Sequence, residues 1–173
     1  MGKITFILGG ARSGKSRQAV KIANQKNKKI AFIATCQPLD EEMRQRIQIH
    51  KKNRPKNWKT FEEPYDIAGK IKKNCNKFDI VLIDCLTLWA SNLLLAGSNE
   101  STIKKEIKKI LSVLRKTKAD SIIVSNEVGS SVVPVNILAR NFRDIAGTIN
   151  QIAAETADRV LFMIAGIPME IKK

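Results

Sequence analysis

The chain has 173 residues, with 31 Lys and Arg against 16 Asp and Glu, and its formal net charge is +15. This length suits one domain over residues 1–173, with a core that buries most of its apolar surface. The three cysteines include no C-x-x-C pair, which argues against a disulfide framework and a zinc site. No apolar run approaches the ~20 residues needed to cross a bilayer and none resembles a signal peptide, so we expect a cytoplasmic protein without membrane insertion.

The first predicted elements enclose a phosphate-binding motif. An apolar run at residues 4–8 predicts a strand, residues 9–16 read GGARSGKS, and a helical pattern follows over residues 16–26. A loop of small residues lets backbone N–H groups converge on phosphate oxygens, and the helix directs its positive dipole end at them. Lys15 is placed to reach the β- and γ-phosphates, and Ser16 to bind the accompanying Mg²⁺. The motif therefore predicts a nucleoside triphosphate site.

The remaining apolar runs predict strands at residues 30–34, 80–83, 122–124 and 160–164, nearly continuous in Ile and Val as in strands buried on both faces. Helical patterns cover residues 40–52, 67–75, 102–116 and 136–156. This alternation predicts an α/β fold of the P-loop NTPase (RecA-like) type, a mostly parallel sheet with helices on both faces. A stripe from Leu138 to Ile152 is expected to place the last helix on that sheet.

Asp84 ends the third strand and resembles a Walker B carboxylate. At the carboxyl end of a strand beside the phosphate loop, this side chain can hold Mg²⁺ directly or through water. An alternative is that Asp84 caps the helix that begins after it, since Asp is a favoured N-cap residue. The two interpretations are compatible.

His50 is the only histidine in the chain, and cationic residues at positions 51, 52 and 54 follow it at the end of a predicted helix. These cations would attract a triphosphate, and a neutral imidazole is a competent nucleophile toward phosphorus. A lone histidine at a helix end can also be an ordinary surface residue. Residue chemistry alone leaves this choice open.

Further carboxylates follow other strands. Glu62 and Glu63 could accept hydrogen bonds from ribose hydroxyls or a guanine edge, or lie on the surface. Asn126 and Glu127 come after the fourth strand and should lie at the edge where open α/β sheets bind ligands, with Glu127 as a base or a metal-shell residue.

Taken together, these segments resemble the bifunctional adenosylcobinamide kinase/adenosylcobinamide-phosphate guanylyltransferases of cobalamin biosynthesis. The similarity covers nearly the whole chain. The residues that carry it are GGARSGKSR at 9–17, AT at 34–35, DEEM at 40–43, RI at 46–47 with His50, RP at 54–55, Trp58, DCLTLW at 84–89, NEVG at 126–129, VP at 133–134 with Asn136, AR at 139–140, FRD at 142–144, Gly147, NQ at 150–151, AD at 157–158 and GIP at 166–168.

The resemblance implies two reactions: phosphorylation of adenosylcobinamide by ATP or GTP, and transfer of GMP from GTP through a guanylyl-histidine to give adenosylcobinamide-GDP and pyrophosphate. It implies that His50 is the catalytic residue, that Ser16 and Asp84 hold Mg²⁺, and that the enzyme is a homo-oligomer, expected to be a trimer. It also implies a nucleotide site formed by Gly9, Gly10, Ala11, Arg12, Ser13, Gly14, Lys15, Ser16, Ala34, Thr35, Cys36, Lys51, Lys52, Asn53, Arg54, Glu62 and Asp84.

Two other functions remain open at this point. The first is a P-loop small-molecule kinase in which His50 is inert. The second is a RecA-like ATPase stimulated by nucleic acid, for which the charge of +15 is the motive. Against the second, the lysines are spread along the chain and aromatic residues make up only 5% of it, too few for a base-stacking platform, so we expect no nucleic-acid partner.

Overall fold

The computed structural model describes residues 1–24, 28–52 and 54–173, and for Arg46 the backbone alone. One seven-stranded sheet organises the described residues, in the order β3-β2-β4-β5-β1-β6-β7, and only β7 runs antiparallel to its neighbour. The strands are β1 (Ile4–Gly9), β2 (Ile30–Ala34), β3 (Lys59–Glu62), β4 (Ile80–Asp84), β5 (Asp120–Asn126), β6 (Arg159–Ile164) and β7 (Ile167–Lys172). The helices are α1 (Lys15–Ala23), α2 (Glu41–Lys52), α3 (Ile67–Asn74), α4 (Leu86–Leu95), α5 (Glu100–Lys116) and α6 (Ile137–Thr156).

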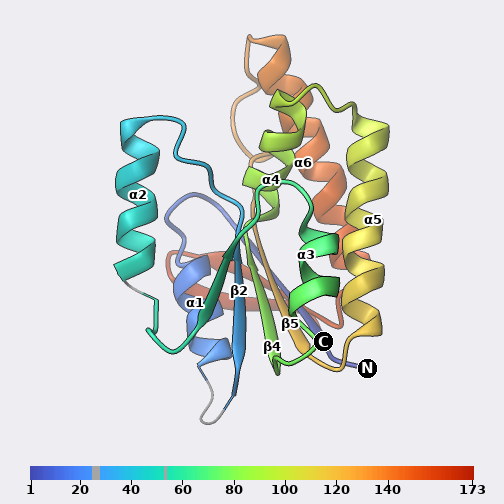
Figure 1. Ribbon diagram of the computed structural model, residues 1–173. Coiled ribbons are helices and arrows are strands. Elements are labelled where there is room, and N and C mark those ends of the chain that lie inside the picture. The colour runs from blue at the N-terminus through green and yellow to red at the C-terminus, as the bar shows by residue number, and fades with distance from the viewer. Residues whose placement is uncertain (25–27, 53) are drawn as a thin grey trace.

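Helices cover both faces of this sheet, as the sequence predicted (Figure 1). The larger apolar core joins α3, α4, α5 and α6 to one face, and it includes the buried stripe of α5 formed by Ile103, Ile107 and Leu114. The smaller core joins Ala19 and Ala23 of α1 to the other face. Helix α2 stands apart from both layers, and none of its described side chains is buried (Figure 1). Among the described residues, no helix has the length and apolar character needed to span a membrane.

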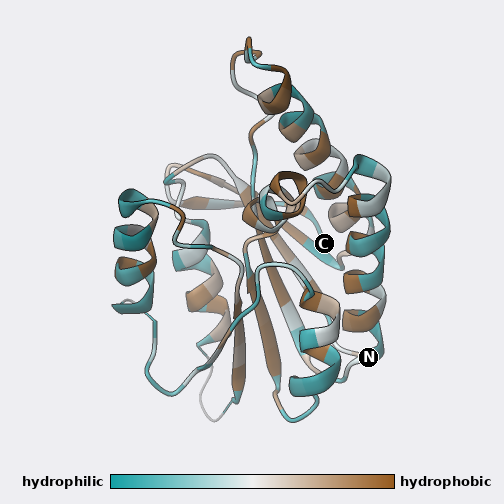
Figure 2. Cartoon of the chain, turned by 45° about the horizontal axis from the view of Figure 1, so that its top comes forward, coloured by the Kyte–Doolittle hydropathy of each residue, from teal (hydrophilic) through white to brown (hydrophobic). Residues whose placement is uncertain are grey.

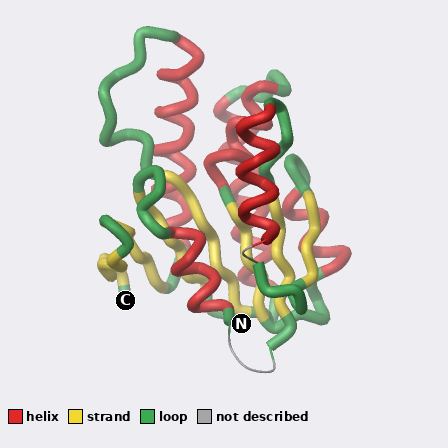
Figure 3. The backbone as a smooth tube through the Cα atoms, turned by 90° about the vertical axis from the view of Figure 1, so that its left-hand side faces the viewer, coloured by secondary structure: helices red, strands yellow, loops and turns green. Residues whose placement is uncertain are grey.

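The two outer strands β3 and β7 are absent from the sequence prediction. Each lies at a sheet edge and most of its residues are partly or fully exposed, so neither forms a continuous apolar run. The C-terminal hairpin of β6 and β7 forms one side of the sheet (Figure 3). It leaves Ile164, Ile167 and Met169 about half exposed or more.

The expected apolar stripe of α6 lies on the sheet only in part. Ile145 and Ile149 are buried, but Leu138 is 49% exposed because the first turns of α6 extend past the other helices. Figure 2 shows this projecting end. The prediction that the whole stripe from Leu138 onward contacts the sheet is therefore wrong.

Asp158 connects several elements near the starts of strands β1 and β6, at the end of the sheet away from the projecting end of α6. Asp158 precedes β6 and accepts hydrogen bonds from the Ile4 backbone N–H at 2.7 Å and from Arg115 of α5, also at 2.7 Å. Arg115 also donates to the Thr156 carbonyl at the end of α6. This contact joins β1, α5 and α6.

Candidate active site

The phosphate loop, residues 9–16, connects β1 to the first turn of α1. Gly14 adopts φ +94°, a left-handed conformation that glycine accepts without strain, and a Cβ there would lie 3.2 Å from Cα of Gly166. Lys15 is buried, and its Nζ donates to the carbonyl of Gly10 at 2.6 Å. Burial lowers the pKa of Lys15, while the nearby Asp84 and Cys85 act to raise it. The loop thus curls around a lysine held at its centre.

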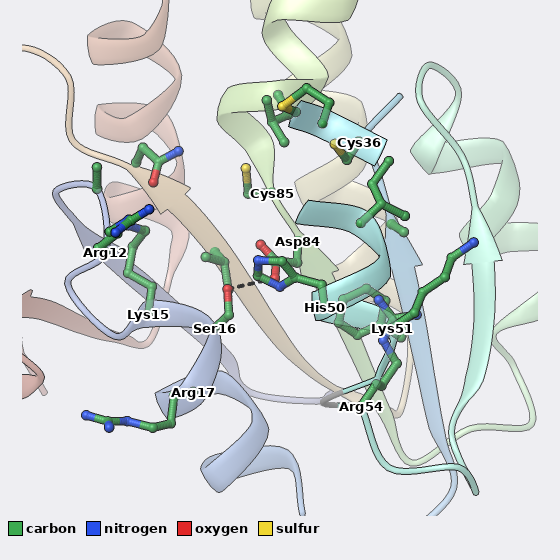
Figure 4. A pocket seen from close by; sticks show the side chains of 18 of the residues that line it. Arg12, Lys15, Ser16, Arg17, Cys36, His50, Lys51, Arg54, Asp84 and Cys85 are labelled. Carbon is green, nitrogen blue, oxygen red and sulfur yellow. Dashed lines mark hydrogen bonds between the residues drawn. The ribbon is translucent and has the colours of Figure 1, made fainter. Parts of the chain in front are cut away.

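Asp84 lies directly opposite the start of α1. The Ser16 hydroxyl donates to Asp84 Oδ2 at 2.9 Å (Figure 4). Burial raises the pKa of Asp84, and the hydrogen bond from Ser16 and the charges of His50, Arg54 and Lys15 act to lower it. The N-cap of α4 is Cys85, without a side-chain cap bond, so the capping role considered for Asp84 is wrong. Two adjacent oxygen atoms beside the phosphate loop fit the hard ligand preference of Mg²⁺.

Thr35 holds the chain that follows Asp84. Its buried hydroxyl donates to the Cys85 carbonyl and accepts from the Cys85 N–H, both at 2.8 Å. Asn92 of α4 donates to the Thr35 carbonyl at 2.8 Å. Thr35 does not line the pocket described next, whereas its neighbours Ala34 and Cys36 do. Its visible contribution is to position the end of β4.

A pocket of about 1050 Å³ joins the phosphate loop to α2. Residues 11–17 form one wall, and Met43, Ile47 and His50 of α2 form the other. Asp84 lies on the floor of the pocket, and its electrostatic interaction with His50 acts to lower the pKa of its carboxyl group. A smaller adjoining pocket of about 340 Å³ is also lined by Ser16, His50 and Asp84. The structure therefore brings the only histidine into one cavity with the phosphate loop (Figure 4).

The cationic residues after His50 make separate contacts. Lys51 Nζ pairs with Glu62 of β3 at 2.6 Å. The Arg54 guanidinium lies 3.5 Å from the centroid of the Phe32 ring and donates to Thr60 Oγ1 at 2.7 Å. Lys52 is exposed and does not line the pocket, and Asn53 lies outside the described residues. Lys51, Arg54 and Glu62 do line it.

Of the two polar residues at the end of β5, only Asn126 lines the pocket. The Glu127 carboxylate turns back and accepts from the Gly129 N–H at 2.6 Å. Asn126 is fixed through its backbone, since its N–H donates to Thr87 Oγ1 at 2.6 Å and its carbonyl accepts from Asn150 Nδ2 at 3.1 Å. Glu63 likewise points elsewhere, toward Lys70 at 3.2 Å.

Several pocket residues were missed as site residues by the sequence reasoning. Arg17 lines both cavities, and the turn at Ala165 and Gly166 borders the phosphate loop. Both turn residues have positive φ, 50° and 86°, and the Gly166 N–H donates to the Ser13 carbonyl at 3.0 Å. A glycine between apolar residues was the available signal for this hairpin turn. The apolar wall of Phe32, Met43, Ile47 and Leu88 gave none, because such residues also fill cores.

Comparison with known proteins gives the family. The family model described as "CobU: Cobinamide kinase / cobinamide phosphate guanyltransferase" matches residues 5–171. The chain belongs to this family. The bifunctional adenosylcobalamin biosynthesis protein CobP of Pseudomonas aeruginosa is 42% identical over 167 residues, which is 96% of each chain. The corresponding CobU protein of Salmonella typhimurium is 40% identical over 179 residues, covering 96% of this chain and 98% of its own.

As a member of the cobinamide kinase / cobinamide phosphate guanyltransferase family, the chain is a transferase of cobalamin nucleotide-loop assembly. Its substrates are cobinamide and nucleotides, and the two rival functions are not favoured. Solved structures agree on the fold alone. The RadB recombinase has a TM-score of 0.57 at 20% identity, covering 93% of this chain and 74% of its own. The KaiC-like protein PH0186 of Pyrococcus horikoshii has a TM-score of 0.54 at 14% identity, covering 93% and 70%.

Proposed function

We propose that His50 carries the guanylyl group between GTP and the cobinamide phosphate. The observation that supports this most directly is that His50, the phosphate loop and the Ser16–Asp84 pair share one pocket. A triphosphate whose terminal phosphates lie on the loop would extend its α-phosphate toward α2. A histidine nucleophile splits the transfer into two displacements, each stabilised by the same cationic surroundings.

In this proposal the nucleotide carries Mg²⁺, held by Ser16 and Asp84. The ion would neutralise charge on the phosphates during both reactions. Lys15 binds the β- and γ-phosphates, the backbone N–H groups of residues 9–16 surround them, and Glu62 accepts from the guanosine. Ala34, Cys36, Lys51 and Arg54 complete the nucleotide site, Cys36 through its backbone. Thr35, Lys52 and Asn53 are the remaining members suggested by the resemblance.

For the kinase reaction, the same loop would hold ATP or GTP while the hydroxyl of adenosylcobinamide attacks the γ-phosphate. Phosphoryl transfer depends mainly on positioning and on charge stabilisation, which Lys15 and the Mg²⁺ pair would supply. The adenosyl form of the substrate, the cytoplasmic location and assembly into a trimer without a nucleic-acid partner are further parts of this proposal.

The test is covalent labelling with GTP. Incubation with α-labelled GTP should give protein-bound label that is released by acid and stable to alkali, whereas γ-labelled GTP should give none. His50→Ala should abolish the label, and Ile49→Ala, on the exposed neighbouring residue, should retain it. If the unmodified protein takes up no label from α-labelled GTP, or if His50→Ala keeps it, the histidine mechanism is wrong.

A further inference from the structure

We propose that the phosphate of the corrinoid acceptor binds in the phosphate loop, in the place that pyrophosphate has left, and that Arg17 is one of the residues that bind it. The inference rests on the proposed guanylyl-histidine mechanism and goes beyond it. It gives the second half-reaction a defined anion subsite and adds a residue that the nucleotide site does not include.

The first displacement sets the direction of approach. A ring nitrogen of His50 attacks the α-phosphorus of GTP, an N–P bond forms, and the bond from phosphorus to the pyrophosphate oxygen breaks. The imidazole gives up its ring proton to solvent, and pyrophosphate leaves. Because attacking and leaving atoms lie roughly in line in such a transfer, pyrophosphate departs on the side of the phosphorus opposite His50.

The second displacement must use that same side. A phosphate oxygen of the corrinoid attacks the guanylyl phosphorus, a P–O bond forms, and the P–N bond to His50 breaks, after which the imidazole takes a proton back from solvent. The attacking oxygen has to lie opposite the leaving nitrogen. The acceptor phosphate therefore enters where pyrophosphate was, which is the phosphate loop.

Charge around the pocket supports this placement. Figure 4 shows Arg12, Lys15 and Arg17 on one side of the Ser16–Asp84 pair and His50, Lys51 and Arg54 on the other. On the His50 side, Lys51 pairs with Glu62, and Arg54 stacks on Phe32 and donates to Thr60. Those cations already have protein partners.

On the loop side, Arg12 and Arg17 are exposed, and within the described part of the chain no carboxylate pairs with either. Arg17 Nη2 lies 2.8 Å from the position that a Cβ on Gly166 would occupy and 3.7 Å from that of a Cβ on Gly14. Its guanidinium thus lies beside the loop against the β6–β7 turn, where a side chain on Gly166 would crowd it and one on Gly14 would only touch it. A planar guanidinium binds a phosphate through paired hydrogen bonds, which suits a phosphate monoester reaching the loop.

The experiment starts from the guanylylated protein and compares two acceptors of its guanylyl group. The protein is guanylylated with labelled GTP and freed of nucleotide and pyrophosphate. It is then mixed in separate single-turnover reactions with pyrophosphate, which regenerates GTP, or with adenosylcobinamide phosphate, which yields the dinucleotide product. Arg17→Ala, Arg17→Lys and Lys21→Ala are compared with the unmodified protein. Lys21 is an exposed cation one turn further along α1 that lines neither cavity.

With one shared subsite, Arg17→Ala should raise the half-saturating concentration of both acceptors by a similar factor, about 10- to 100-fold, as expected for loss of a hydrogen-bonded charge. Arg17→Lys should restore part of the loss for both, and Lys21→Ala should change neither. The inference is overturned if Arg17→Ala impairs pyrophosphate and spares the corrinoid phosphate, or if it affects neither acceptor. Failure of the unmodified protein to take up label would instead overturn the histidine mechanism on which the inference rests.

Discussion

Asp84, which we propose holds the Mg²⁺ of the nucleotide, has an environment that does not favour its ionised form. Its partly buried carboxyl lies on the floor of the pocket, the burial raises its pKa, and its direct hydrogen-bond donor is the Ser16 hydroxyl. An ionised carboxylate with a raised pKa weakens the folded state at neutral pH, because the unfolded chain ionises it more easily. Thr35 and Asn92, in contrast, use their polar atoms to hold backbone.

Asp84→Asn is expected to leave the Tm of the nucleotide-free protein unchanged or to raise it by a few degrees, about 1 kcal/mol, because the amide removes the buried charge and keeps an oxygen for Ser16. Both transferase activities should fall by roughly 100-fold or more, since charge stabilisation at the phosphates is lost. Thermal melts with and without GTP and Mg²⁺, alongside the two activity assays, measure this. A large drop in Tm without nucleotide would show that Asp84 is a structural residue instead.

At the scale of elements, the proposed nucleophile His50 lies on α2, a helix that is weakly attached to the rest of the molecule. None of its described side chains is buried, and the Lys51–Glu62 ion pair at its end is exposed. Helices with few buried contacts open at low free-energy cost. We therefore expect amide hydrogens of α2 to exchange at least about 100-fold faster than those of α5, and to slow when His50 is guanylylated. Hydrogen-exchange mass spectrometry measures both, and equal protection of α2 and α5 in the free protein would contradict it.

The Asp158 contact gives an element-scale prediction with a pH dependence. The hydrogen bonds from Arg115 and from the Ile4 N–H hold the pKa of Asp158 below its usual range. A lowered pKa means that the stabilisation is present at neutral pH and is lost as the pH falls through the folded-state pKa. Asp158→Asn should lower the free energy of unfolding by about 1–2 kcal/mol at pH 7, discounted for the partial exposure of the pair.

The difference between the two proteins should shrink as the pH is lowered toward about 3, where the native carboxyl also becomes protonated. Urea denaturation across this pH range measures it. Asp144→Asn, on an exposed carboxylate 4.0 Å from Arg143, is the control and should have little effect. If the difference in free energy of unfolding stayed constant with pH, the charge of Asp158 would not be the source of its stabilising effect.

At the scale of the whole molecule, the net charge of +15 favours the approach of anionic substrates. Arg12 and Arg17 are exposed and line the pocket, and an excess of positive charge raises encounter rates with triphosphates. Raising NaCl from about 0.05 to 0.5 M should therefore lower kcat/KM for GTP by roughly tenfold, with a smaller effect on kcat. Steady-state kinetics at fixed Mg²⁺ tests this, with sucrose as an uncharged control. If kcat/KM for GTP did not change with NaCl concentration, electrostatic steering of the substrate would be excluded.

The exposed apolar residues of the β6–β7 hairpin predict where copies of the chain meet. Phe162 pairs with Met169 and Ile164 with Ile167, so these side chains share one face of the edge. We expect light scattering to give about three times the 19.3 kDa chain mass, and Met169→Lys to shift the protein toward monomer. Leu95→Lys, at an exposed apolar position at the end of α4, should leave the mass unchanged. A monomeric unmodified protein would refute the expected trimer.

The sequence predicted the fold where local patterns and tertiary burial agree. The five inner strands are continuous apolar runs and the phosphate loop is a contiguous motif, so both were visible in the chain. The edge strands β3 and β7 were not, because exposure on one or both faces removes the apolar signal. Within the site, the pocket's apolar wall and Arg17 depend on how distant segments approach one another, and no local pattern encodes that. The prediction that His50 acts together with the phosphate loop rested on the family resemblance, because the spacing of the residues did not indicate it.

The hydrogen bond from the Gly166 N–H to the Ser13 carbonyl joins the turn of the β6–β7 hairpin, at the edge of the sheet, to the loop of residues 9–16. The hairpin whose outer strand we expect to contact neighbouring copies also lies, at its tip, against the backbone of the proposed phosphate loop. A neighbouring copy that restricted the motion of this hairpin would also restrict the motion of the phosphate loop. Association of subunits would then affect the rate of turnover.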